Sequence, residues 1–177
     1  ISACLVGSEM CIRDSLQGVA GLLQQNAVRH PEVAVVLSEA VGQVRAIAQV
    51  YGLQVGMTGP LGLAGLLRAI AQSVQLTFGQ TISVAQGELE SGEVPHQLPE
   101  TEAIPVALVL NELLTNAIKH GAGASGVRCA LQAEGAEVLV RIAGRGRLPA
   151  GFSLAQTPSG VSGLGLVRAL LPRRSAE

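Results

Sequence analysis

Residues 111–121, "NELLTNAIKHG", carry the most informative pattern in the chain. They follow the apolar run "EAIPVALVL", so one helix is predicted over residues 102–120. Apolar residues that recur in steps of four and three share one face of this helix, and that face is predicted to pack against a sheet. These residues are Val106, Leu110, Leu113 and Ala117.

A second face of the same helix is polar. Glu112, Asn116 and Lys119 share it, and Asn111 and His120 flank it. A solvated helix face usually carries Glu and Lys, whereas asparagine is a mediocre helix former. Two asparagines suggest side-chain amides that coordinate or hydrogen-bond a ligand. This stretch alone leaves a binding site and a solvated face as equal alternatives.

The composition describes a small globular protein with little charge. The 177 residues are 48% hydrophobic and 14% charged, with a formal net charge of −1, which suits one or two domains. Near-neutral charge gives no reason to expect nucleic acid or an anionic membrane as a partner. No stretch reaches the apolar length of a membrane span and no signal peptide is apparent, so a cytoplasmic location is expected. The cysteines at positions 4, 11 and 129 lack the spacing of a metal site or a disulfide framework.

The N-terminal part predicts an antiparallel helical hairpin over residues 16–55. A helical pattern runs from Leu16 to about Arg29, and Pro31 suits the first turn of a second helix over about 32–55. The second helix repeats apolar residues in steps of four and three, which is typical of a helical bundle. These are Val33, Leu37, Ala40, Val44, Ile47 and Tyr51. Two hairpins would complete a dimeric four-helix bundle, which we favour over packing on the rest of the same chain.

Residues 56–60, "GMTGP", are predicted to link the hairpin to a second domain, residues 61–177. "LGLAGLLRAIAQSV" predicts a helix followed by short strands, "GVRCALQAEG" and "AEVLVRIAG" predict a β-hairpin, and "LGLVRALL" predicts a final helix. Helices combined with a mixed or antiparallel sheet predict a two-layer α/β sandwich, so the whole chain is α+β.

Residues 144–167 form a long segment rich in Gly, Pro and Ser that leads into the last helix. Loops of this length often act as lids over a site. Glycines before a helix N-terminus let backbone N–H groups face a phosphate. The segment is not a P-loop, because it lacks the Gly-Lys-Ser/Thr ending.

Together, the asparagine-bearing helix, "GRG" and "SGLGL" resemble the nucleotide-binding fold shared by gyrase B subunits, chaperone ATPases, mismatch-repair ATPases and histidine kinases, the GHKL fold. "NELLTNAIKHG" looks like the N box of the histidine kinases, Gly144 and Gly146 look like the G1 box, and Gly163-Leu-Gly-Leu looks like the G2 box. The hairpin resembles the kinases' dimerisation and phosphotransfer region. "LQGVAGLLQQNA" is similar to the second such family, whose phosphoacceptor helix reads His-Arg-Val-Lys-Asn-Asn-Leu-Gln. The resemblance covers about residues 16–172.

This resemblance implies a site for ATP and Mg²⁺. Asn116 would hold Mg²⁺, Glu112 would orient or activate the attacking group, and Asn111 would assist. The other residues implied at the nucleotide are Lys119, His120, Gly144, Gly146, Ser162, Gly163, Leu164 and Gly165. Residues 144–163 would form the ATP lid. The parent protein would form a homodimer through residues 16–55, autophosphorylate on a histidine, and pass the phosphoryl group to an aspartate of a response-regulator receiver domain.

Two positions depart from the family pattern. Ile142 stands where the G1 box has an aspartate that binds the adenine amine. The phosphoacceptor histidine falls at Met10, so this chain is not expected to autophosphorylate. His30 is expected to cap a helix rather than to accept phosphate, and His96 lies in a predicted loop.

Residues 1–15 break the pattern as well, because they have no clear helical period and "SEMCIRDS" resembles translated adapter sequence. Two explanations stay open. One is a corrupted or truncated gene end, and the other is a pseudokinase that carries Met10 by descent. The C-terminus also looks short, since the family usually adds a strand after the last helix. Two other functions remain as alternatives. One is a non-catalytic dimerising scaffold, favoured by Met10 and Ile142; the other is an anti-sigma-factor-like serine kinase, which would lack the hairpin.

Overall fold

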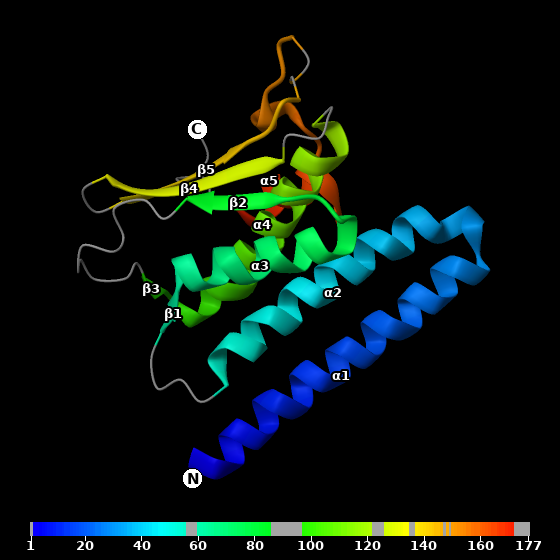
Figure 1. The fold of residues 1–177 in the computed structure, drawn as a ribbon, viewed down its shortest axis with the longest axis vertical. Coiled ribbons are helices and arrows are strands. Elements are labelled where there is room, and N and C mark those ends of the chain that lie inside the picture. The colour runs from blue at the N-terminus through cyan, green and yellow to red at the C-terminus, as the bar shows by residue number, and fades with distance from the viewer. Residues whose placement is uncertain are drawn as a thin grey trace.

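The computed structural model describes residues 2–55, 60–85, 97–121, 126–134, 137–146, 148 and 150–171. Most of the predicted linker, His96 and the C-terminal residues 172–177 lie outside these ranges. Within them, a helical hairpin, a layer of helices and a sheet follow one another through the molecule (Figure 1).

Helices α1 (Ser2–Arg29) and α2 (Ala34–Gln54) form an antiparallel hairpin, joined by the short 3-10 helix η1 (Pro31–Val33). The predicted hairpin is therefore confirmed (Figure 1). Helix α1 begins at Ser2, so it crosses the expected boundary at residues 15–16 without interruption. A helix in a protein is stabilised mainly by packing on its neighbours, so a segment without an amphipathic period can still extend it. A separate origin for residues 1–15 stays a prediction.

Two side-chain contacts give the register of the hairpin. Arg45 Nη2 donates to Gln24 Oε1 at 2.7 Å. A Cβ atom placed on Gly52 would lie 3.3 Å from Arg13 Cδ. Residues 13–24 of α1 therefore run beside residues 45–52 of α2.

His30 lies at the turn of the hairpin and precedes a helix as predicted, but its side chain does not cap that helix. It occupies the N-cap position of η1, and its side chain makes no capping hydrogen bond. Its Nδ1 atom instead lies 3.1 Å from Glu32 Oε1, and both side chains are exposed. Such an exposed pair contributes little to stability. Pro31 opens η1, as its fixed φ predicts.

The remaining elements form the predicted two-layer α/β sandwich. They are β1 (Leu61–Gly62), α3 (Leu63–Phe78), β2 (Ile82–Ala85), β3 (Gln97–Leu98), α4 (Glu100–His120), β4 (Val127–Glu134), β5 (Glu137–Ala143), η2 (Leu154–Gln156) and α5 (Gly163–Leu170). The main sheet has the order β2-β4-β5, with β2 parallel to β4 and β4 antiparallel to β5. The predicted β-hairpin and the mixed sheet are therefore confirmed. Strands β1 and β3 form a separate antiparallel pair.

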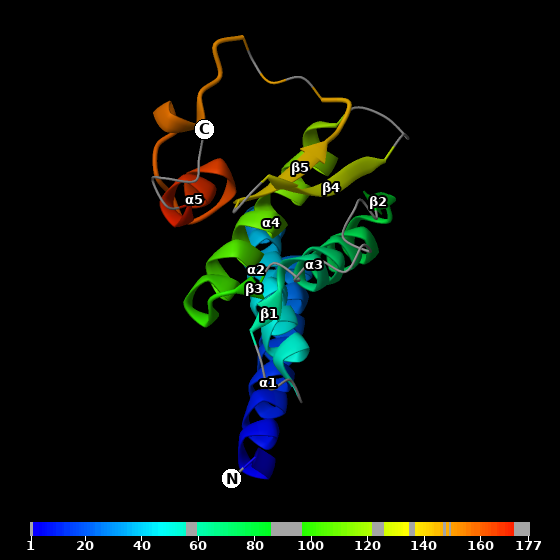
Figure 2. The same cartoon turned by 90° about the vertical axis from the view of Figure 1, so that its left-hand side faces the viewer.

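Helix α4 lies between α3 and α5 (Figure 2). Its buried apolar residues include Ala103, Ala107, Leu110, Leu114 and Ile118. The predicted apolar face was right at Leu110, and Val106 and Ala117 pack at the edge of the core, but Leu113 is half-buried and lies outside it. Helix α4 contacts α2, α3, α5 and the sheet. Its buried surface is therefore wider than the single apolar face that the sequence period predicts, and it is rotated relative to that face.

Helix α2 packs against α3 and α4 of the same chain, which is the alternative that its sequence left open. Its fully buried residues are Val41, Ala46, Ala48 and Val50. The predicted seam residues are half-buried, apart from exposed Val33. One face of α2 is therefore used within the chain.

The expectation that no stretch suits a membrane span needs correction. Residues Pro31–Gln54 are long and apolar enough to cross a membrane by length and composition, with a mean hydropathy of 1.4. One such helix is weak support for a span, because the core helices of soluble proteins meet the same criterion. Polar residues of this helix, among them Gln43 and Arg45, hydrogen-bond other parts of the chain.

The core lies between α3, α4 and the inner face of the sheet. It includes Leu66, Leu67 and Ile70 of α3, each with no exposed surface, and Cys129 of β4. Burial raises the pKa of the Cys129 thiol to about 11. This cysteine therefore stays protonated at neutral pH and acts as a small apolar side chain.

Candidate functional site

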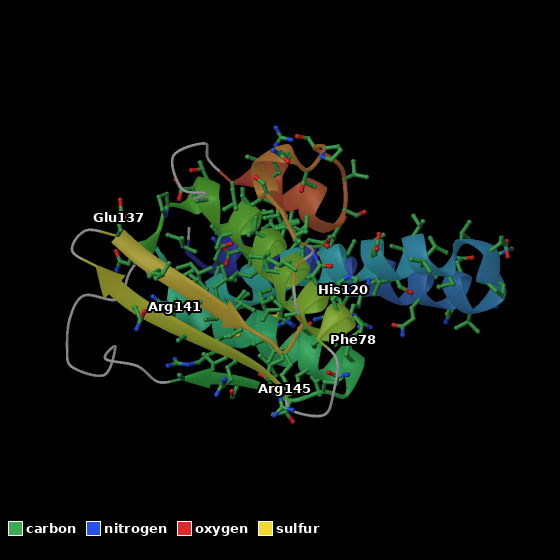
Figure 3. All side chains as sticks on the ribbon, turned by 90° about the horizontal axis from the view of Figure 1, so that it is seen from above. Phe78, His120, Glu137, Arg141 and Arg145 are labelled. Carbon is green, nitrogen blue, oxygen red and sulfur yellow. The ribbon has the colours of Figure 1, made fainter. Side chains whose placement is uncertain are left out.

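The glycines that follow β5 lie against the C-terminal turn of α4. A Cβ atom on Gly144 would lie 3.4 Å from the carbonyl oxygen of Ala117, and one on Gly146 would lie 2.5 Å from that of His120. The second distance is too short for any side chain, so the close approach requires glycine. Figure 3 shows His120 and Arg145 toward the same end of the sheet, away from Glu137.

The first turn of the last helix lies against the middle of α4. Gly163, the first residue of α5, has φ +59° and donates its backbone N–H to Glu112 Oε2 at 3.0 Å. A Cβ atom on Gly165 would lie 2.8 Å from the carbonyl oxygen of Pro158, so this turn is also tightly packed. Arg168 of α5 donates to the carbonyl oxygen of Thr157 and holds α5 to the preceding segment. Both glycine-bearing segments that sequence analysis singled out therefore meet the predicted helix.

Glu112 is a buried carboxylate at the junction of three segments. Its side chain is 5% exposed. Oε2 accepts the Gly163 N–H, and Oε1 accepts a hydrogen bond from Gln43 Nε2 at 3.1 Å. The same Gln43 nitrogen donates to the carbonyl oxygen of Val161 at 2.9 Å. A buried carboxylate needs such donors, and the positive end of α5 stabilises its charge.

Asn111 and Lys119 face the hairpin rather than the glycines. Asn111 is 8% exposed, and a Cβ atom on Gly42 of α2 would lie 3.2 Å from its Nδ2 atom. Lys119 Nζ lies 3.7 Å from Glu39 Oε1 of α2. Both residues also line a cavity of about 290 Å³ between α2, α3 and α4. We name the packing of Glu39, Gly42 and Gln43 against α4 the hairpin contact.

Asn116 carries a buried polar atom without a partner. Its Nδ2 atom makes no hydrogen bond with any described residue. An unsatisfied buried donor costs about 1–3 kcal/mol, so such a group is unusual unless a ligand satisfies it. The terminal amide can also turn to present its oxygen at the same place. Among the described residues no group of three His, Cys, Asp or Glu side chains could hold a metal, so a metal here would need oxygens from a ligand. Asn116 therefore fits a magnesium-bound phosphate ligand.

Three further predicted site residues lie at the ends of helices α4 and α5. Ser162 is half-buried at the N-cap position of α5 without a capping hydrogen bond, and Leu164 is half-buried in the first turn. His120 is exposed at the end of α4. Ile142 lies opposite Cys129 in the sheet and packs on the core, so the predicted adenine position presents no carboxylate.

Sequence reasoning missed Gln43, the residue that joins α2 to both α4 and the segment before α5. Its partners are 69 and 118 positions away along the chain. The one local signal is the dipeptide Gly42-Gln43 in the middle of the predicted helix. A glycine next to a polar residue lets a neighbouring helix approach closely, so this pair indicates a close polar contact between helices.

No protein-family model matches the sequence, and no curated protein matches it. A solved structure does: the histidine kinase domain from the Erythrobacter litoralis EL346 blue-light activated histidine kinase. The two share a TM-score of 0.56 and 21% sequence identity, over 91% of this chain and 83% of that chain. The chain therefore has the fold of a histidine kinase domain, a helical hairpin followed by an α/β domain.

Proposed function

We propose that this chain is the ATP-binding transmitter portion of a two-component sensor histidine kinase. The observation that carries the proposal is the buried Asn116 Nδ2 atom, which has no hydrogen-bond partner among the described residues, on the helix that Gly144, Gly146 and Gly163 contact. Neutral backbone donors, a side-chain amide and close-packed glycines together suit a phosphate ligand better than an apolar one.

Each residue of the site has a role in this proposal. The Asn116 amide would hold Mg²⁺, which when bound neutralises phosphate charge. Glu112 would orient or activate the attacking group, with Asn111 assisting. The remaining contacts to the nucleotide would come from Lys119, His120, Gly144, Gly146, Ser162, Gly163, Leu164 and Gly165. Residues 144–163 would close over the site as a lid and exclude water.

The parent protein would phosphorylate a histidine at position 10 of α1 and transfer the phosphoryl group to a receiver aspartate. It would act in the cytoplasm as a homodimer through residues 16–55. Large exposed apolar side chains on the hairpin support the dimer, because a second hairpin would cover such side chains in a four-helix bundle. They are Val19, Leu22, Val28, Val35 and Val36, each at least 46% exposed.

Calorimetry with Mg-ATP tests the nucleotide site. The unaltered chain is expected to bind, and removal of magnesium is expected to weaken binding. Asn116→Ala should weaken it about tenfold or more, because a hydrogen bond to a charged group contributes about 1.5–3 kcal/mol. Asn26→Ala is the matched control, since Asn26 is exposed on α1 and its side chain donates to the carbonyl oxygen of Leu22 in the same helix. Absence of binding by the folded chain, or equal binding by Asn116→Ala, would contradict the proposal.

A dimerising scaffold without kinase activity is the second candidate. Apolar Ile142 in the sheet core and Met10 on α1 favour it, because a working kinase needs adenine recognition and an acceptor. The serine-kinase alternative is disfavoured by the long α1–α2 hairpin. A folded chain that dimerises but takes up no nucleotide at millimolar concentration would make the scaffold the better account.

A further inference from the structure

We propose that the hairpin contact holds the nucleotide site in a resting state with lowered affinity for nucleotide. Gln43 is the residue that maintains this state. This inference rests on the proposed function, since it concerns regulation of the same site. It is carried by the hydrogen bonds of Glu112, by the packing of α2 on α4, and by where along the hairpin that packing occurs.

First, Glu112 occupies the place that a phosphate would take. The N–H of Gly163 opens helix α5, and such a group is suited to an anion. In the structure its acceptor is Glu112 Oε2 at 3.0 Å. A phosphate oxygen and the carboxylate cannot both accept this hydrogen bond, and their like charges repel. Nucleotide binding at α5 therefore requires Glu112 to move away from Gly163.

Second, Gln43 holds Glu112 in that place. Its Nε2 atom donates to Glu112 Oε1 at 3.1 Å and to the carbonyl oxygen of Val161 at 2.9 Å. One amide group therefore joins the hairpin to α4 and to the residues just before α5. Close to Gln43 on α2, Glu39 Oε1 lies 3.7 Å from Lys119 Nζ. Because Gly42 has no side chain, Asn111 of α4 packs closely against α2 at this position.

Third, the hairpin contact lies far from the position of the phosphoacceptor. Gln24 pairs with Arg45, so Gln43 lies beside the part of α1 just beyond Gln24. Position 10 is about 14 residues away from there, which corresponds to about 21 Å along a helix axis. Reacting atoms need to approach to about 3 Å. Glu112 cannot serve position 10 of its own hairpin until the contact opens.

Backbone hydrogen exchange of the full chain without nucleotide tests the contact. Gln43→Glu keeps the size of the side chain but places a carboxylate against Glu112 and the Val161 carbonyl. Exchange in residues 38–46 and 160–166 is expected to rise about tenfold or more, with the sheet unchanged. Gln49→Glu, the same change elsewhere on α2, should leave both segments as they are.

A second substitution makes the test specific. In Gln43→Glu/Glu112→Gln, the new amide at position 112 can donate to the new carboxylate at position 43 and still accept from Gly163. Protection of residues 160–166 should recover in part, because the carboxylate at position 43 still faces the carbonyl oxygen of Val161. No rise in Gln43→Glu, or no recovery in the double variant, overturns the proposal.

Nucleotide affinity separates this inference from the proposed function. Gln43→Ala should bind Mg-ATP about three- to tenfold more tightly than the unaltered chain, because Glu112 is then less firmly held at α5. Equal affinity together with unchanged exchange overturns the resting state and leaves the kinase proposal standing. The expected exchange pattern with no nucleotide binding by any variant supports the hairpin contact and contradicts the proposed function instead.

Discussion

A chain carrying Met10→His is expected to incorporate phosphate from Mg-ATP on α1, where the unaltered chain incorporates none. Met10 is 42% exposed on α1, so an imidazole there would be accessible to a docking nucleotide domain. Imidazole nitrogen is a competent nucleophile toward a phosphoryl group, whereas a thioether is not. The change therefore supplies an imidazole at the position where the histidine kinases that this sequence resembles carry their phosphoacceptor.

The measurement is transfer of labelled phosphate, with the modified peptide identified by mass spectrometry and by the acid lability of phosphohistidine. Cys11→His is the matched control, because Cys11 is exposed on the neighbouring face of the same helix. Adding Glu112→Gln should lower the rate about 10²–10⁴-fold if Glu112 acts as a general base. Labelling of both histidine variants at the same rate would contradict the assignment of position 10, as would no labelling of Met10→His in a chain that binds ATP.

Leu114→Ala is expected to give the largest loss of stability among single changes in α4. Its side chain has no exposed surface and lies in the main core between the helices and the sheet. Truncation of a buried leucine costs about 2–5 kcal/mol, because the cavity left behind is only partly refilled. Denaturant unfolding followed by circular dichroism would measure this loss as a lower midpoint with little change in slope.

Leu113→Ala is the control for this prediction. Leu113 is half-buried and outside the core, so its truncation should cost about 1 kcal/mol or less. The two leucines are adjacent in sequence, and their different losses report directly on the orientation of α4. Equal losses, or a larger loss at Leu113, would mean that the helix presents the face that its periodicity predicts.

The elements with strong local patterns could be predicted from the sequence. The long helix around residues 102–120, the α1–α2 hairpin and the β4–β5 hairpin each follow from spacing over neighbouring residues. The N-terminal half of α1 could not be predicted in this way, because residues 2–15 show no helical period. The orientation of α4 was also missed at Leu113, because a helix covered by several neighbours buries more than one stripe.

The site was predictable in part. The convergence of Gly144, Gly146 and Gly163 on α4 was expected from the resemblance to nucleotide-binding domains. The packing of Asn111 and Lys119 on the hairpin was not expected, because it depends on how two distant parts of the chain meet. The contact of Gln43 was not predicted for the same reason, since a helix period describes one helix and not its partner.

The central claim is that Mg-ATP binds where α4 meets the two glycine-bearing segments. Two-dimensional NMR of the isotopically labelled chain, titrated with Mg-ATP, tests it most directly. The account predicts that chemical-shift changes concentrate at Asn116, Gly144, Gly146 and Gly163 and grow smaller when magnesium is removed. Changes confined to other surfaces, such as the exposed turn of the hairpin at His30, or no changes at millimolar nucleotide, would contradict it.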